Sequence, residues 1–135
     1  QFKGDICVQT IEDEEIVNHV IREGESFFIP PNVPHAPQRP PDTIGIVVER
    51  NRHAGETEHQ QFYCPNCHQF AWDEEFDCND IVDHFSASME AFWADEERAT
   101  CPNCNTRIMK PAPVARIETE PEVQIIRQRG QSGSD

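Results

Sequence analysis

The chain has 135 residues, a length that suits one domain or one domain with an appendage. Its 11 Lys and Arg residues against 25 Asp and Glu residues give a formal net charge of −14. This charge argues against nonspecific binding to nucleic acid or to an anionic membrane surface, and no apolar run approaches the ~18 residues of a membrane-spanning helix.

The N-terminal part of the sequence predicts β structure. Two short runs, 5–10 and 15–21, flank a turn at 12–14, and a third strand is expected at 26–29, ended by Pro30 and Pro31. The run 44–49, with sequence IGIVVE, is the most convincing strand and is apolar enough to be buried. Strands about ten residues apart, with Gly and Pro between them, are typical of a sandwich or barrel. Because the first residue is Gln and the opening QFKGDICV resembles the middle of a strand, we expect the natural chain to continue upstream.

The following segment, 57–104, contains one predicted helix. Its apolar residues recur at helical spacing on one face, and either Asn79 or Asp80 is a candidate N-cap. The residues of this face are Ile81, Phe85, Met89, Phe92 and Trp93. Segment 73–97 holds ten acidic residues and no Lys or Arg, and we interpret this run as a solvated face rather than an acidic binding surface.

Four of the six cysteines form two identical Cys-Pro-Asn-Cys motifs. Two residues between thiolates let both sulfurs of one turn reach one ion at about 2.3 Å, so the motifs predict a tetrahedral, structural metal site. Its ligands would be Cys64, Cys67, Cys101 and Cys104. The ion could be zinc or iron, as in rubredoxin, because four sulfurs suit both metals. Four unrelated thiols or a disulfide pair are less favoured alternatives.

Residues beside the cysteine motifs refine this prediction. His68 and Asn105 follow the two motifs where rubredoxin-type turns often have Gly, and both residue types tolerate a left-handed backbone. Cys7 and Cys78 stand alone and are expected to be buried thiols.

A second motif precedes a histidine. Gly24 begins a strand that Pro30 ends, and His35 stands five residues after this proline. The pattern resembles the second conserved motif of the cupins, small β-barrels that hold a metal inside, in which the last histidine is a metal ligand. Asn32 stands where a Gly is usual, and Arg39 where an Asn is usual.

The flanks of this motif sharpen the resemblance. HAPQRP at 35–40, VVER at 47–50, YCPNC at 63–67 and CPNC at 101–104 occur in this order. The chain is similar, over about residues 1–108, to the 3-hydroxyanthranilate 3,4-dioxygenase family in its short microbial form. The implied fold is mainly β, an N-terminally truncated cupin (jelly-roll) barrel at 1–58. A rubredoxin-like metal region with one α-helix would follow at 59–108, and 109–135 would be an extended or disordered tail in which 123–126 could add an edge strand.

The resemblance also implies an activity. The family opens the ring of 3-hydroxyanthranilate with O2 to give 2-amino-3-carboxymuconate semialdehyde, in the tryptophan catabolism that leads to quinolinate and NAD. It uses non-haem Fe(II) held by two His and one Glu. By motif, His35 matches an iron ligand, Arg39 the arginine that binds the substrate carboxylate, and Glu49 a catalytic glutamate that contacts the substrate amine and hydroxyl. The microbial relatives are homodimers, and a cytoplasmic location follows from the free thiols and the family.

The residue types agree with these roles. Imidazole suits Fe(II), a guanidinium fits a planar carboxylate with two bonds, and a carboxylate can accept a hydroxyl proton. A buried Glu49 would need a partner, for which Arg39 and Arg50 are candidates. Gly4 matches the closing Gly of the first cupin motif, which places the other iron ligands upstream of Gln1, so we expect this chain to be an inactive fragment. The alternative is a non-catalytic interaction module that binds a metal through its four paired cysteines and carries a degenerate half-cupin.

Overall fold

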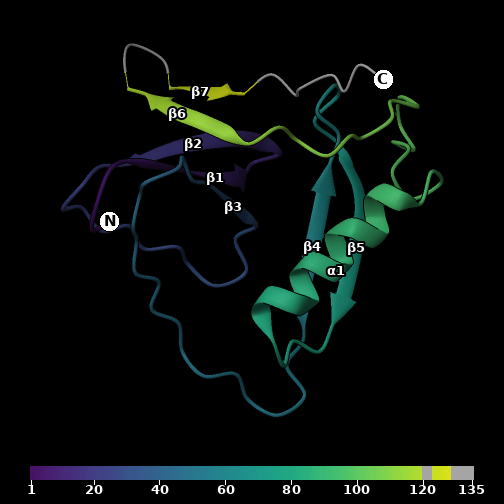
Figure 1. Ribbon diagram of the computed structural model, residues 1–135. Helices are drawn as coiled ribbons and strands as arrows, with labels where there is room; N and C mark the ends of the chain where they lie inside the picture. Colours follow the sequence, from purple (N-terminus) through teal and green to yellow (C-terminus); the bar gives the residue numbers. More distant parts are fainter. Residues whose placement is uncertain (120–122, 129–135) are drawn as a thin grey trace, which may run out of the picture. The chain divides into compact units, whose positions relative to one another are not determined.

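The computed structural model describes residues 1–119 and 123–128 of the chain. These residues divide into two compact units, unit 1 within Gln1–Val48 and Pro111–Asp135, and unit 2 at Glu49–Lys110. The described residues form seven strands and one helix, so the predicted mainly β fold is confirmed (Figure 1). No helix in this part of the chain is long and apolar enough to cross a membrane.

Unit 1 begins with a β-hairpin. Strand β1 (Ile6–Glu12) pairs antiparallel with β2 (Glu15–Ile21), in a register that places Glu12 opposite Glu15. The two turn residues, Asp13 and Glu14, have φ values of 49° and 65°. Two successive left-handed residues match a type I′ turn, whose twist suits a two-residue hairpin. Both strands and the turn were predicted from the sequence.

A third strand pairs with the other edge of β1. Strand β3 (His35–Gln38) gives the sheet the order β2-β1-β3. Ile6, Val8 and Ile21 are buried on this sheet, and Ile29 packs against them. An antiparallel sheet with one apolar face fits the cupin interpretation.

Two predicted strands of unit 1 are wrong. Residues 26–29 are not in a strand, and in 44–49 only Ile44 makes a bridge, to Lys3. Ile46, Val47 and Val48 are 76%, 74% and 90% exposed. The apolar sequence predicted a buried strand, but a strand also needs a neighbour for its backbone hydrogen bonds, and the described residues supply none beyond that bridge.

Unit 1 also contains a C-terminal hairpin. Strand β6 (Val114–Glu118) pairs antiparallel with β7 (Gln124–Arg127), so the edge strand predicted at 123–126 is confirmed. Val114 is buried, and the Arg127 guanidinium donates a hydrogen bond of 3.1 Å to Gln38 Oε1 on β3. Residues 114–118 and 124–127 of the predicted tail therefore form paired β structure.

Unit 2 contains a β-hairpin that the sequence analysis missed. Strands β4 (Glu58–Tyr63) and β5 (Phe70–Phe76) pair antiparallel on either side of the first Cys-Pro-Asn-Cys motif. Both strands are rich in Glu, Gln and Asp, so their sequences lack the apolar signal that was used to find strands. Their connection is the metal-binding turn itself.

Helix α1 (Ile81–Ala94) follows, with Asp80 as its N-cap, one of the two residues predicted for this position. One carboxylate oxygen of Asp80 accepts hydrogen bonds of 2.9 Å from the backbone N–H groups of Val82 and Asp83. The helix packs through its C-terminal half: Phe92 is 1% exposed, whereas Ile81 is 55% exposed. The predicted apolar face is therefore buried only toward that end.

Phe92 anchors the helix on the β4–β5 hairpin. Its ring stacks on Phe62 of β4, with the ring centroids 3.7 Å apart and an interplanar angle of 9°. Trp93 packs edge-on against the same Phe62 ring. The helix and the hairpin thus share one aromatic core.

We expect Phe92→Ala to lower the free energy of unfolding by about 3–5 kcal/mol, because it removes a fully buried ring and leaves a cavity. The measurement is urea unfolding of the zinc-saturated chain, followed by far-ultraviolet circular dichroism. Val82→Ala is the control, since Val82 lies on the same helix and is 69% exposed. Similar losses for both variants would contradict this packing.

Candidate metal centre

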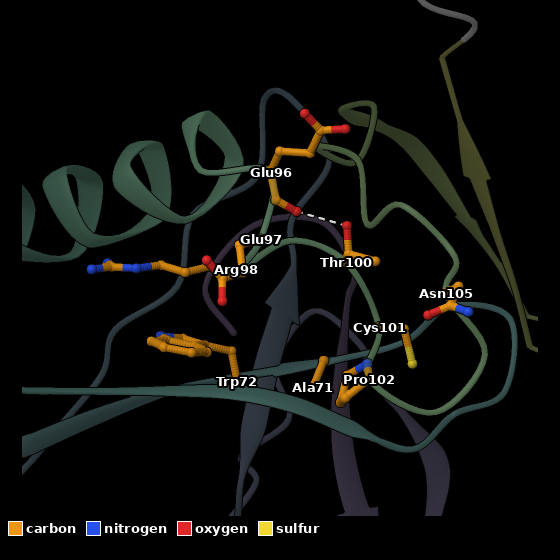
Figure 2. Close-up of a pocket in the computed structure, with 9 residues that line it drawn as sticks. All are labelled: Ala71, Trp72, Glu96, Glu97, Arg98, Thr100, Cys101, Pro102 and Asn105. Carbon is orange, nitrogen blue, oxygen red and sulfur yellow. Dashed lines mark hydrogen bonds between the residues drawn. The ribbon is translucent and has the colours of Figure 1, made fainter.

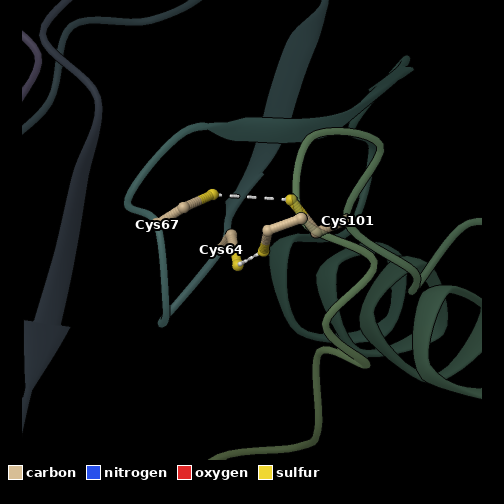
Figure 3. Close-up of side chains that lie close together, drawn as sticks. Cys64, Cys67 and Cys101 are labelled. Carbon is tan, nitrogen blue, oxygen red and sulfur yellow. Dashed lines mark hydrogen bonds between the residues drawn. The ribbon is translucent and has the colours of Figure 1, made fainter.

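Four cysteine sulfurs converge in unit 2. The first Cys-Pro-Asn-Cys turn (64–67) joins β4 to β5, and the second turn (101–104) follows α1. All four Sγ atoms lie within 4.8 Å of one another, and the pairs Cys64–Cys104 and Cys67–Cys101 are each 3.6 Å apart (Figure 3). Metal–sulfur bonds of about 2.3 Å place the sulfurs of a tetrahedral site about 3.8 Å apart. The predicted cluster is confirmed, and its spacing fits one metal ion.

The four thiols are chemically suited to a closed site. All are free cysteines, and sulfurs 3.6 Å apart are well beyond the S–S bond of about 2.05 Å. Four thiolates fill a tetrahedral coordination sphere and leave no position for a substrate. Zinc and iron both fit this donor set. The arrangement therefore indicates a structural centre.

The two turns have the same backbone geometry. His68 and Asn105, which follow the two motifs, have φ values of 60° and 58°, so the left-handed positions predicted for them are confirmed. Their N–H groups donate hydrogen bonds of 2.9 Å to the carbonyls of Cys64 and Cys101. The two Cys-Pro-Asn-Cys turns therefore share the same backbone conformation and the same hydrogen bond.

Polar groups around the sulfurs were not predicted. The Asn66 backbone N–H donates to Cys64 Sγ at 3.4 Å, and its side-chain Nδ2 donates to Cys104 Sγ at 3.6 Å. Thr106 Oγ1 lies 3.1 Å from Cys104 Sγ. The signal in the sequence was the asparagine shared by both motifs, which the spacing argument treated as a spacer.

Burial and hydrogen bonding shift the pKa values of Cys101 and Cys104 in opposite directions. Cys101 is 0% exposed and lies in the core beside Ala99 and Phe92, and this burial raises the pKa of its thiol to about 11. Hydrogen bonds from Thr106, and then from Asn66, lower the pKa of Cys104 to about 6. Without metal, burial therefore favours the protonated thiol of Cys101, whereas hydrogen bonding favours the thiolate of Cys104.

A hollow of about 660 Å³ lies beside the second turn (Figure 2). Arg98 is placed above the Trp72 ring, 5.3 Å from its centroid, and is ion-paired with Asp95 at 3.2 Å and Glu74 at 3.5 Å. The Arg98 cation is already matched by two carboxylates, so it is not free to bind an anionic ligand. Its ion pair with Glu74 ties the segment before Cys101 to β5.

The candidate iron ligand His35 lies at the start of β3. It is opposite Thr10 in the β1–β3 register, while Pro37 is opposite Val8, so His35 shares the apolar sheet face of Val8 and Thr10. Its Nδ1 lies 2.8 Å from the carbonyl oxygen of Val33. A histidine that donates Nδ1–H to a carbonyl presents the lone pair of Nε2, as metal-ligating histidines commonly do.

The candidate substrate-binding residue Arg39 also lies in unit 1. Its Nη1 is 3.4 Å from both Gln1 Oε1 and Thr43 Oγ1, and no described carboxylate pairs with it. A Cβ at Gly45 would lie 2.6 Å from Arg39 Nη2. Because Gly45 has no side chain, it leaves the space that the guanidinium occupies. The sequence analysis missed this role because Gly45 lies within the apolar run that was interpreted as a strand.

Glu49 is the first residue of unit 2 and is exposed. Arg50, one of the two candidate partners for a buried Glu49, instead forms a two-bond ion pair with Glu56, at 2.7 and 2.8 Å. Glu49 has no ion-pair partner within the described ranges, so its carboxylate is available.

The lone cysteines behave as predicted. Cys7 and Cys78 are buried and free, at 0% and 8% exposure. Their sulfurs are not part of the four-sulfur cluster.

Comparison with known proteins identifies a family that matches this chain. Residues 1–93 match the family model described as 3-hydroxyanthranilic acid dioxygenase. A 3-hydroxyanthranilate 3,4-dioxygenase of Candida albicans is 42% identical over 106 residues, which cover 78% of this chain and 62% of the relative. The protein of that name from Neurospora crassa is 38% identical over 104 residues, covering 77% of this chain and 58% of the relative. The matched part of the chain thus spans about three fifths of the length of these curated relatives.

We expect metal binding to release protons, and the affinity for metal to fall as the pH is lowered. Cys101, with a pKa of about 11, carries its proton at neutral pH and must lose it to bind the ion. Calorimetric titration with zinc, in buffers of different ionisation enthalpy near pH 7, should give a slope of at least one proton released.

The matched control is Cys78→Ser, which lies outside the cluster and should release the same number of protons. Binding heats that do not depend on the buffer would contradict a thiol-to-thiolate change at this centre.

Proposed function

Because this chain belongs to the 3-hydroxyanthranilic acid dioxygenase family, we propose that the protein containing it opens the aromatic ring of 3-hydroxyanthranilate with O2. The product would be 2-amino-3-carboxymuconate semialdehyde, in which both atoms of O2 are retained. The relatives that support this proposal bear the name 3-hydroxyanthranilate 3,4-dioxygenase.

His35 is the proposed iron ligand in this chain. The observation that carries the proposal is its hydrogen bond from Nδ1 to the Val33 carbonyl, on a side chain that shares the apolar face of the sheet. This bond fixes the tautomer and orients Nε2 for a metal. Fe(II), when bound, supplies open coordination positions for substrate and O2. A facial triad needs two further ligands besides His35.

Arg39 is proposed to bind the substrate carboxylate. A guanidinium presents parallel N–H groups that match a carboxylate in two bonds, which fixes the orientation of the ring. Contacts with Gln1 and Thr43 hold one edge of this guanidinium, and no described acid neutralises it. A free and partly oriented cation suits an anionic substrate.

Glu49 is proposed to accept a proton from the substrate hydroxyl and to contact the neighbouring amine. A carboxylate within hydrogen-bond reach of a hydroxyl can act as a general base. Its lack of an ion-pair partner among the residues described is consistent with this task, because a carboxylate tied to an arginine would be a weaker base.

The four-cysteine centre is proposed to bind iron or zinc as a structural ion. The oligomeric state and the compartment implied by the resemblance, a homodimer in the cytoplasm, stay predictions.

The test of the activity uses a protein in which this chain is preceded by the upstream segment of a family member, reconstituted anaerobically with Fe(II). We expect oxygen uptake with 3-hydroxyanthranilate, its loss in His35→Ala, and a KM about 10-fold or more higher in Arg39→Lys, because lysine cannot form the two-bond contact. His53→Ala and Arg50→Lys are the matched controls and should retain activity.

A silent protein that still holds one metal on its cysteines would refute the dioxygenase proposal. The non-catalytic metal-binding interaction module would then be the better account.

Gly45→Ala tests the arrangement around Arg39 independently. The added methyl would lie 2.5 Å from Gln1 Oε1 and 2.6 Å from Arg39 Nη2, the far ends of two flexible side chains. We therefore expect the guanidinium to move, with KM raised several-fold while the midpoint of thermal unfolding stays within a few degrees. An unchanged KM would show that Arg39 does not need this position.

A further inference from the structure

One asparagine contacts both Cys-Pro-Asn-Cys turns. The Asn66 backbone N–H donates to Cys64 Sγ of its own turn, at 3.4 Å, and its side-chain Nδ2 donates to Cys104 Sγ of the second turn, at 3.6 Å. Asn66 thus joins the two turns through their sulfurs.

We propose that Asn66 is a positioning residue that holds the two turns together around the metal ion. It is not a ligand, because its amide N–H groups donate to the sulfurs rather than bind the ion. It acts through Cys64 and Cys104. This inference does not depend on the dioxygenase proposal, since the cluster lies wholly within unit 2.

The chemistry of the site favours such donors. Four thiolates around one divalent ion leave the centre with a net charge of −2, in contact with an apolar core. Hydrogen bonds to charged acceptors are stronger than neutral ones, so carboxamide N–H groups on the sulfurs stabilise this charge. Groups outside the ligand set that bind the ligands commonly change metal affinity 10- to 100-fold.

This bond between the turns has a kinetic consequence. Metal loss begins when one turn swings away from the ion, which breaks the bonds of that turn to the ion. Here the same movement must also break the hydrogen bond from Asn66 Nδ2 to Cys104, since this bond spans the two turns. Asn66 should therefore slow the release of metal.

A simpler explanation is that asparagine is present because it suits a turn. Asparagine and aspartate are both common in turns, for the same reason, so turn preference alone predicts that Asn→Asp is harmless. The aspartate has the same shape but cannot donate when ionised. Asn→Ala removes the donor without adding a charge, which separates the loss of a hydrogen bond from charge repulsion.

The experiment uses the full 135-residue chain loaded with zinc, and follows transfer of the metal to a chromogenic chelator. We expect Asn66→Ala to release metal about 10-fold faster, and Asn66→Asp to release it at least as fast. Asn51→Asp, an exposed asparagine of unit 2 with no sulfur contact, is the matched control and should be unchanged. Cobalt-loaded samples should keep the absorption of a tetrahedral thiolate site, which shows that each variant still folds around the metal.

A release rate of Asn66→Ala within twofold of the parent chain would overturn the proposal. A second measurement needs no mutation. In the chain loaded with a magnetic cadmium isotope, nuclear magnetic resonance should detect scalar coupling from cadmium to the side-chain amide protons of Asn66. Coupling to backbone amides alone would also overturn the proposal.

Discussion

The convergence of four cysteine sulfurs is the constraint on which the structure of unit 2 depends. Cys64 and Cys101 are two of its six core residues, alongside Phe92 and three smaller residues, so the apolar core by itself is small. An ion at this point would close two loops, of 34 and 40 residues between paired sulfurs. Closing such loops restricts the unfolded chain, and in small metal-binding domains the binding energy is folding energy. The hairpin, the helix and the second turn are held as one body by the same centre.

Unit 1 depends instead on strand register. Because side chains alternate between the two faces of a strand, the pairing of β3 with β1 alone determines that His35 lies on the face of Val8 rather than on that of Cys7. A shift by one residue would place His35 on the other face. The tautomer of the histidine is set just as locally, by a carbonyl two residues before it. The candidate chemistry of this unit therefore rests on backbone geometry more than on side-chain packing.

The sequence predicted the features that depend on local chemistry and missed those that depend on partners. The cysteine spacing, the Asp80 cap and the turn at Asp13 and Glu14 are each determined by a few adjacent residues, and all were predicted. The run 44–49 has a strong strand preference but makes only one bridge, because pairing depends on a neighbour that the run does not encode. Strands β4 and β5 were missed for the converse reason: their pairing is imposed by the turn between them, in spite of a polar sequence. The contacts of Asn66 with Cys104 and of Gly45 with Arg39 depend on the folded chain, and no spacing rule reveals them.

Arg107 links the metal centre to the helix. Located three residues beyond Cys104, its guanidinium donates hydrogen bonds to the carbonyls of Trp93 and Asp95, at 2.7 and 3.1 Å, at the end of α1, where backbone carbonyls have no N–H donors within the helix. The indole nitrogen of Trp93 is buried and makes no hydrogen bond within the described part of the chain. Loosening of the second turn would release the end of the helix and let water reach this indole. Trp93 is thus a built-in fluorescent reporter of metal occupancy, whose emission should shift to longer wavelength as the ion is withdrawn.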